Sequence, residues 1–256
     1  MANPKTIAKT ESEEPTRRLA VLIDADNAQA AIIGGLLEEI ASFGEATVKR
    51  IYGDFTSPHS SQWKKVLNKY AIKPVQQFAY TTGKNATDST LIIDAMDLLY
   101  TRRFDGFCLV SSDSDFTGLA LRIREEGLMV LGFGEKKTPE AFINACHKFV
   151  PTELLRPVTA QKSERITPEI QESSSEDSPK DFILNALEKI CKDGGWTNLA
   201  NLGNYLTKLK PDFDVRLYGF KSLGAMVKAH KDIFEIEEKS TSDSPAKVLY
   251  IRKKLS

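Results

Sequence analysis

The chain has 256 residues, of which 41% are hydrophobic and 27% charged, so it can bury a core for one large domain or two modest ones. No apolar run reaches the roughly 18–20 residues that a membrane-spanning helix needs, and the polar N-terminal segment lacks the apolar stretch of a secretory signal. Three widely spaced cysteines argue against a disulfide framework and against a cysteine-type zinc site. These features favour a cytoplasmic protein without a membrane partner.

The formal net charge of zero hides an uneven distribution along the chain. Lysine and arginine number 18 against 19 acidic residues in 1–150, 3 against 6 in 151–179, and 14 against 10 in 180–256. A mildly basic C-terminal part suits a nucleic-acid partner, although many solvated surfaces are equally basic.

Composition divides the chain into four expected segments: a disordered tail over 1–17, a first folded domain over 18–155, a flexible linker over 156–180 and a second folded domain over 181–254. The linker is rich in Ser, Glu and Pro and poor in apolar residues, so it cannot bury enough surface to offset its ordering entropy. We expect it to act as a flexible tether between the two domains.

Short apolar strands alternate with helical patterns through the first domain. In chain order, the expected elements are strand 19–23, helix 28–42, strand 47–52, helix 60–70, strand 74–79, helix 87–100, strand 107–110, helix 116–125, strand 128–133 and helix 139–147. Thr138 is the expected N-cap of the last helix, with Pro139 at its first position. This alternation predicts an α/β fold with a Rossmann-like parallel sheet covered by helices on both faces.

The second domain is mostly helical. Apolar faces at helical spacing occur within 182–190, 199–206 and 223–233, and the segments 234–237 and 248–251 alternate like the strands of a small hairpin. Three helices and a two-stranded wing predict a small winged-helix domain.

Acidic residues follow the buried strands of the first domain. Asp24 follows the first strand, and Asp113 and Asp115 follow a later one, so the carboxyl ends of a parallel sheet would bring them to one edge. Asp88 opens a helix that also contains Asp94. Six residues turn a helix by about 600°, or roughly 240° net, so these two do not share a face and Asp88 is the better site candidate.

Carboxylates placed together repel one another, and a hard divalent cation with oxygen ligands resolves the conflict. A bound Mg²⁺ or Mn²⁺ ion can lower the pKa of a water and hold a phosphate, which suits in-line attack on a phosphodiester. His59 and His147 lie far from the acidic motifs in sequence, which argues against a Ser/His/Asp triad. The alternative is helix capping, which explains each aspartate singly but not their gathering at one edge.

Three segments of the first domain resemble the motifs of the NYN domain, in the LabA/DUF88-type branch that is related to PIN nucleases. They are residues 21–27 (VLIDADN), 87–94 (TDSTLIID) and 110–116 (VSSDSDF). The resemblance covers about residues 18–150 and implies a Rossmann-like sheet with a metal-dependent ribonuclease site.

By this resemblance, Asp24, Asp88 and Asp113 are metal ligands, and Asp115 is a ligand or an outer-shell carboxylate; all four are catalytic candidates. Two further matching residues, Asn27 and Ser112, would steady metal-bound waters or the substrate phosphate. From the residues themselves, Lys84 lies in a Gly-containing loop before the motif helix, where it could hold a substrate phosphate or simply face solvent.

Residues 194–200 and 217–223 resemble an OST-HTH/LOTUS domain, which implies RNA or protein binding over about residues 180–254. Arg216 and Lys221 are the cations that we expect on a phosphate-contacting face. Phe220 and Leu223 are expected to pack in the core.

The sequence therefore predicts a metal-dependent ribonuclease whose C-terminal module recruits RNA through the tether. A homodimer and protein partners of the C-terminal domain stay open. One alternative is a catalytically silent RNA-binding or scaffold protein. Another is a phosphatase of the haloacid dehalogenase type, since Asp24 and Asp26 fit a D-x-D pair and Asp113 and Asp115 fit a late acidic pair.

Overall fold

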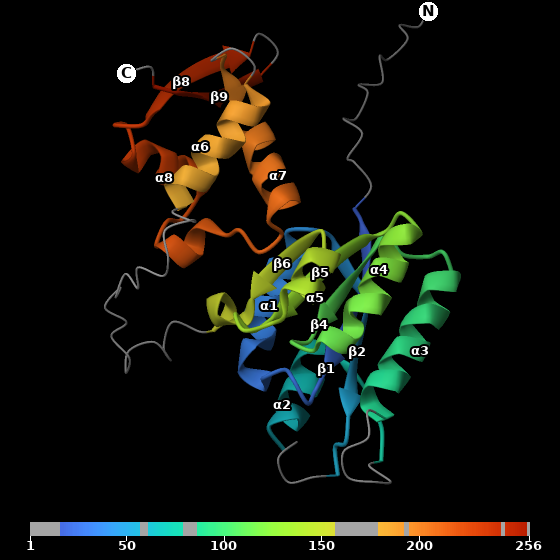
Figure 1. Cartoon of the computed structure of the whole chain (residues 1–256). Helices are drawn as coiled ribbons and strands as arrows, with labels where there is room; N and C mark the ends of the chain where they lie inside the picture. The colour runs from blue at the N-terminus through green and yellow to red at the C-terminus, as the bar shows by residue number, and fades with distance from the viewer. Residues whose placement is uncertain are drawn as a thin grey trace, which may run out of the picture.

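The computed structural model describes residues 16–56, 61–78, 86–156, 179–191, 195–241 and 244–254, which form two domains (Figure 1). Most of the expected tail and linker therefore lies outside the described residues. Within the described residues, no helix has both the length and the apolar character needed to cross a membrane.

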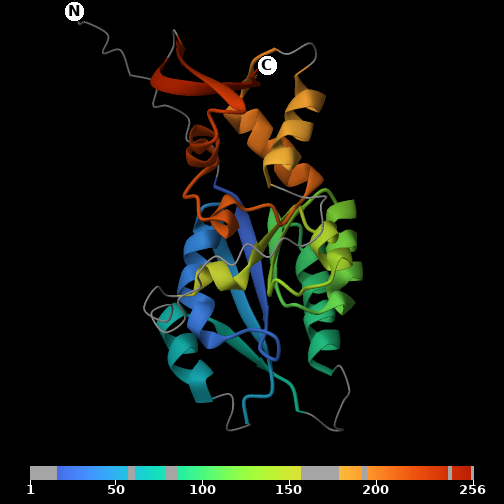
Figure 2. The ribbon, with the colours of Figure 1, turned by 60° about the vertical axis from the view of Figure 1, so that its left-hand side comes forward.

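The N-terminal domain is built on a six-stranded parallel sheet with the order β3-β2-β1-β4-β5-β6. The strands are β1 (Arg18–Asp24), β2 (Glu45–Gly53), β3 (Lys73–Gln76), β4 (Gly106–Val110), β5 (Met129–Gly134) and β6 (Lys148–Pro151). The helices are α1 (Ile33–Ala41), α2 (Ser61–Tyr70), α3 (Ala86–Tyr100), α4 (Thr117–Glu125) and α5 (Glu140–Ala145). Helices α1 and α2 cover one face of the sheet and α3, α4 and α5 the other (Figure 2). The predicted α/β fold is confirmed.

Strand β1 shows why this sequence forms a buried central strand. Leu19, Val21 and Ile23 pack into the core on the α1 side, whereas Ala20 and Leu22 pack into the core on the opposite side. Side chains alternate across a strand, so an unbroken apolar run suits a strand with helices on both faces. β1 pairs with β2 and β4, and Asp24 follows this run at the carboxyl end of the sheet.

The structure corrects three local predictions. Helix α1 begins at Ile33 rather than Ala28, after a short 3₁₀ turn. Thr138 is not the N-cap of α5: Pro139 is, no side chain caps the helix, and Thr138 Oγ1 is buried without a hydrogen-bond partner. The last helix ends at Ala145, and the next residues form the unpredicted strand β6, which makes a sheet edge.

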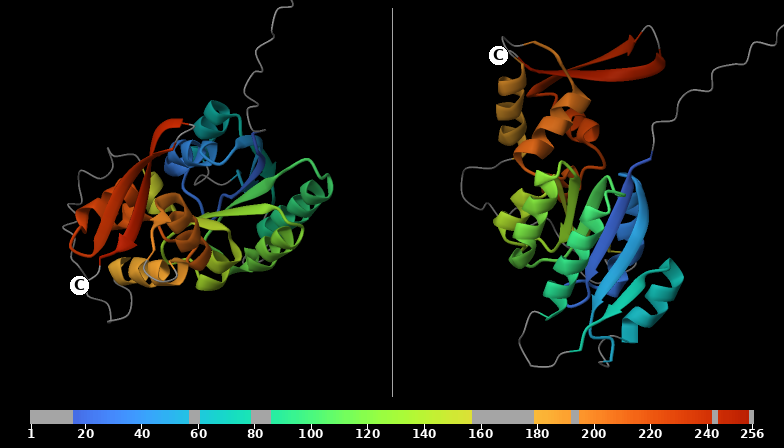
Figure 3. Two further views of the ribbon diagram at one scale, coloured as in Figure 1. Left: turned by 90° about the horizontal axis from the view of Figure 1, so that it is seen from above. Right: turned by 90° about the vertical axis from the view of Figure 1, so that its right-hand side faces the viewer.

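The C-terminal domain has three helices over a small antiparallel sheet with the order β7-β9-β8 (Figure 3). Its elements are α6 (Pro179–Ile190), β7 (Thr197–Asn198), α7 (Leu199–Leu209), α8 (Leu223–Ala229), β8 (Phe234–Thr241) and β9 (Ser244–Lys253). Ile251 and Phe234 on the inner face of the sheet pack with Leu202 and Met226 from the helices. The winged-helix prediction is confirmed, with the two-residue strand β7 as an addition.

The two domains touch beside strand β6. The amide of Phe149 donates a hydrogen bond to the carbonyl of Pro211 (3.0 Å), and Lys148 Nζ donates to the carbonyl of Phe213 (2.9 Å). In Figures 1 and 2 the C-terminal domain lies beyond the amino ends of the strands, with the β8–β9 ribbon on its far side. The second domain therefore contacts the first one directly.

Candidate metal centre

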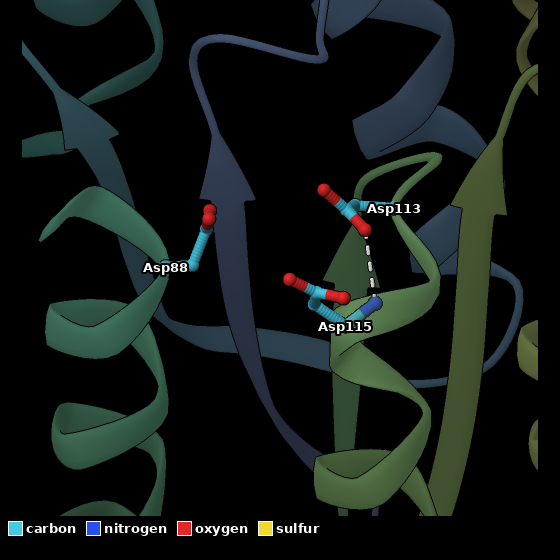
Figure 4. A group of neighbouring side chains, drawn as sticks. All are labelled: Asp88, Asp113 and Asp115. Carbon is cyan, nitrogen blue, oxygen red and sulfur yellow. Dashed lines mark hydrogen bonds between the residues drawn. The ribbon is translucent and has the colours of Figure 1, made fainter. Parts of the chain in front are cut away.

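Three carboxylates from two segments meet at the carboxyl end of the sheet. Asp88 comes from the first turn of α3, Asp113 from the loop after β4, and Asp115 from the 3₁₀ helix Ser114–Phe116. One oxygen of each lies within 4.8 Å of the others, and Figure 4 shows Asp88 facing the other two. We call these residues the acidic trio.

Asp24 lies beside the acidic trio but is not part of it. Its side chain is fully buried, and both oxygens accept hydrogen bonds: Oδ1 from the amide of Asp26 (3.0 Å), and Oδ2 from Asn27 Nδ2 (2.7 Å) and Ser111 Oγ (2.9 Å). Burial raises the pKa of the Asp24 carboxyl, and these hydrogen bonds work against that rise. Three hydrogen-bond donors thus hold the buried carboxyl group of Asp24 in place.

Ser111 is a site residue to which sequence reasoning gave no role. Its hydroxyl donates to Asp24 and accepts from the amide of Asp113 (3.1 Å), so it links β1 to the loop after β4. The loop also needs Gly134, because a Cβ there would lie 2.6 Å from the Ser111 carbonyl oxygen. The available signal was its position directly after a buried strand, inside an acidic motif.

The electrostatics of the site are dominated by like charges. The pKa of Asp88 is raised to about 6, first by burial and then by the charges of Asp24, Asp113, Asp115 and Asp26. Among the described residues, no lysine or arginine forms an ion pair with Asp88 or Asp113. Three carboxylates at this spacing form an oxygen donor set of the kind that suits Mg²⁺ or Mn²⁺, and a divalent cation would relieve their repulsion.

Capping is confirmed for one aspartate and coexists with the trio. Asp113 is the N-cap of the 3₁₀ helix, and its Oδ1 accepts from the amide of Asp115 (2.9 Å). Asp24 bonds the amide of Asp26 in a turn and caps no helix. A cap uses one oxygen of Asp113 and leaves the gathering of three carboxylates unexplained.

The other predicted site residues lie as follows. Asn27 supports Asp24, and Ser112 Oγ accepts from the amide of Glu135 (2.8 Å), which ties its loop to β5. Lys84 lies outside the described residues. Asp94 bonds Arg50 and Tyr52 and is not part of the trio, in keeping with the helix rotation expected from the sequence.

The two cations predicted in the C-terminal domain are not brought to the trio. Arg216 bonds Glu39 of α1 (2.8 Å) and Asp214 (2.7 Å) at the domain contact. Lys221 is exposed just before α8. The guanidinium of Arg216 is thus occupied by two carboxylates, and this position departs from the expected phosphate-contacting role.

The geometry also weighs against the phosphatase alternative. That chemistry needs Asp24 as a nucleophile with an accessible oxygen. Asp24 is instead fully buried, and its two oxygens accept three hydrogen bonds. A nucleophilic attack would have to break this network first.

Comparison with known proteins locates both domains. The NYN domain family matches residues 18–155, and the OST-HTH/LOTUS domain family matches residues 176–244. No curated protein matches the chain.

Two solved structures are similar to parts of the chain. A protein of unknown function from Vibrio parahaemolyticus is 18% identical with a TM-score of 0.47, over 55% of this chain and 96% of that one. An uncharacterized protein from Nitrosomonas europaea is 48% identical with a TM-score of 0.28, over 38% of this chain and 92% of that one. On the match over residues 18–155, the chain belongs to the NYN domain family of PIN-like nucleases, and it carries a C-terminal OST-HTH/LOTUS domain.

Proposed function

We propose that this protein is a metal-dependent endoribonuclease that hydrolyses RNA phosphodiester bonds at the acidic trio. The observation that carries the proposal is the meeting of Asp88, Asp113 and Asp115 within 4.8 Å in a domain of a PIN-like nuclease family. When bound, Mg²⁺ or Mn²⁺ supplies a water of lowered pKa and charge neutralisation at the phosphate.

The chain's own residues would hold that ion and order the site around it. The three carboxylates of the trio offer oxygen ligands, with Asp115 the most exposed of them. Asp24 adds a buried carboxyl group nearby, held by Asn27 and Ser111. The charges that raise the pKa of Asp88 are the same charges that would draw a cation to the site.

The OST-HTH/LOTUS domain supports RNA as the substrate, because domains of this type bind RNA. The domain is not held by a tether alone. It contacts β6 and α1, at the end of the sheet opposite the trio. We propose that RNA held by this domain runs along the N-terminal domain to reach the trio. Lys221, exposed and outside the domain contact, remains our candidate for a phosphate contact, and a phosphate contact by Lys84 stays a prediction from the sequence.

The test uses purified full-length protein, labelled single-stranded RNA and Mn²⁺ or Mg²⁺. The wild type should cleave the RNA, and Asp113→Asn should cleave it at least about 100-fold more slowly, because the ligand set loses a charge. Asp97→Asn is the matched control, since Asp97 is exposed on α3 away from the trio.

Two outcomes would overturn the proposal. Equal cleavage by wild type and Asp113→Asn would identify a contaminant. RNA binding without cleavage in either metal would favour the catalytically silent RNA-binding protein. The cleavage rates in Mg²⁺ and in Mn²⁺ show which ion supports the activity better. The homodimer stays a prediction, and sedimentation would test it separately.

A further inference from the structure

A neutralised carboxylate lies on the same helix as Asp88. Asp94 follows Asp88 by six residues, so it projects at roughly 240° around the axis and about 9 Å further along it. Arg50 Nη1 donates to one oxygen of Asp94, and the Tyr52 hydroxyl donates to the other. Each oxygen of Asp94 thus has its own donor from strand β2.

Both donors reach helix α3 from one face of strand β2. Arg50 and Tyr52 are two apart on β2, so they project from the same face of the strand toward α3. Tyr52 is fully buried, and the side chains of Arg50 and Asp94 are only 23% and 22% exposed. Hydrogen bonds to a charged group that is shielded from water are stronger and more directional than surface ion pairs. Burial and the bond to Asp94 raise the pKa of Tyr52, so its hydroxyl stays a donor.

The first turn of α3 places Asp88 among like charges, so repulsion opposes its position at the sheet edge. The charges of Asp24, Asp113 and Asp115 all repel Asp88. The remaining contacts of α3 with the sheet are mostly apolar, and burial of an apolar stripe fixes the rotation of a helix less sharply than directed hydrogen bonds do. The apolar residues are Leu91, Ala95, Leu98 and Leu99.

We propose that Asp94, held by Arg50 and Tyr52, is a positioning residue that sets the rotation of α3 and keeps Asp88 against Asp113 and Asp115. Its effect on metal binding rests on the function proposed above. Residues that orient metal ligands without touching the metal typically change affinity by about 10–100-fold when mutated. Loss of the Asp94 contacts should therefore weaken the trio as a metal site while the ligands themselves remain.

The test measures Mn²⁺ affinity by calorimetry on the full-length protein, well below its unfolding temperature. Tyr52→Phe removes one hydroxyl and Asp94→Asn removes the charge, and each should weaken Mn²⁺ binding about 10-fold or more. Asp97→Asn removes an exposed charge from the same helix and should leave the affinity unchanged. Wild-type affinity in folded Tyr52→Phe and Asp94→Asn proteins would overturn the inference.

A second readout separates this inference from the proposed function. Without metal, hydrogen exchange at the amides of residues 90–93 should be faster in Tyr52→Phe than in the wild type, with residues 96–100 unchanged. If the wild type neither binds Mn²⁺ nor cleaves RNA, the proposed function fails, and exchange alone then decides the inference. Unchanged exchange at 90–93, or equal acceleration along the whole helix, would contradict a positioning role.

Discussion

Acidic residues lie close together at both ends of the central sheet, but their surroundings differ. At the carboxyl end, Asp88 and Asp113 meet with Asp115. Within the part of the chain that the structure describes, neither Asp88 nor Asp113 forms an ion pair with lysine or arginine. At the amino end, Glu39 and Asp214 share the guanidinium of Arg216. The amino end thus supplies its own countercharge to Glu39 and Asp214.

The pKa directions express the same contrast. Burial and the charges of neighbouring aspartates together raise the pKa of Asp88 to about 6. Burial also acts to raise the pKa of Asp214, but the hydrogen bonds and charge of Arg216 outweigh it, and the pKa falls below its ordinary value. The carboxylate of Asp214, with Arg216 beside it, holds structure together, whereas the like charges around Asp88 would favour a bound cation.

The largest expected effect is on chemistry at the carboxyl end. Asp88→Asn should lower RNA cleavage at least about 100-fold, because one of three charged oxygen donors is lost. Glu39→Gln, which removes a charge at the opposite end, should leave the rate per folded molecule within a few-fold of the wild type. The measurement is the rate of labelled-RNA cleavage by both variants at equal concentrations of folded protein. Similar losses of rate in the two variants would contradict a site confined to the carboxyl end.

The next effect concerns stability at the amino end. Arg216→Ala leaves Glu39 and Asp214 without their shared partner and should cost about 2 kcal/mol in the free energy of unfolding, moderated by the partial exposure of the arginine. Glu39→Ala and the double variant complete a cycle, for which urea unfolding should give a coupling energy of about 1 kcal/mol. A coupling energy of zero would mean that this contact does not hold the domains together.

A third variant probes the support of the buried carboxylate. Ser111→Ala removes a donor from Asp24 and should cost about 2 kcal/mol, because a bond to a buried charged group is lost. Ser112→Ala loses an acceptor for the neutral amide of Glu135 and should cost about 1 kcal/mol. Urea unfolding of the two variants ranks them, and the reverse order would contradict the stronger support that we assign to the Ser111 hydroxyl.

The smallest effect is a pH dependence without metal. The folded pKa of Asp88, about 6, exceeds its ordinary value of 3.8, so between these values the folded state binds more protons than the unfolded state. The contribution of Asp88 to stability therefore falls as pH rises from about 4 to about 6 and stays lost above that. The difference between wild type and Asp88→Asn in thermal unfolding should follow this window, and added Mn²⁺ should reverse the loss in the wild type alone.

The sequence was sufficient for the fold where local patterns are strong. The five expected strands and the helix faces predicted the parallel sheet, because periodicity records which faces are buried. β6 and β7, of four and two residues, were not predicted, and they form where neighbouring strands supply their hydrogen-bond partners. Thr138 has a typical capping pattern, but the helix begins two residues later and its hydroxyl is buried without a partner.

The candidate site was predictable in type but not in detail. Rules for parallel sheets placed the aspartates at one edge, and the structure brings Asp88, Asp113 and Asp115 together there. No local pattern could show that Asp24 would be enclosed by three donors, since Ser111 reaches it from the loop after β4. Likewise, Arg216 looked like a phosphate contact because Glu39, its partner, lies far away in sequence.

The most direct test is Mn²⁺ binding to the metal-free protein, followed by calorimetry for the wild type and Asp113→Asn. We expect saturable binding by the wild type that Asp113→Asn loses, with Asp97→Asn unchanged. Equal binding by wild type and Asp113→Asn, or no saturable binding at all, would contradict the claim that the carboxyl end of the sheet is a divalent-cation site.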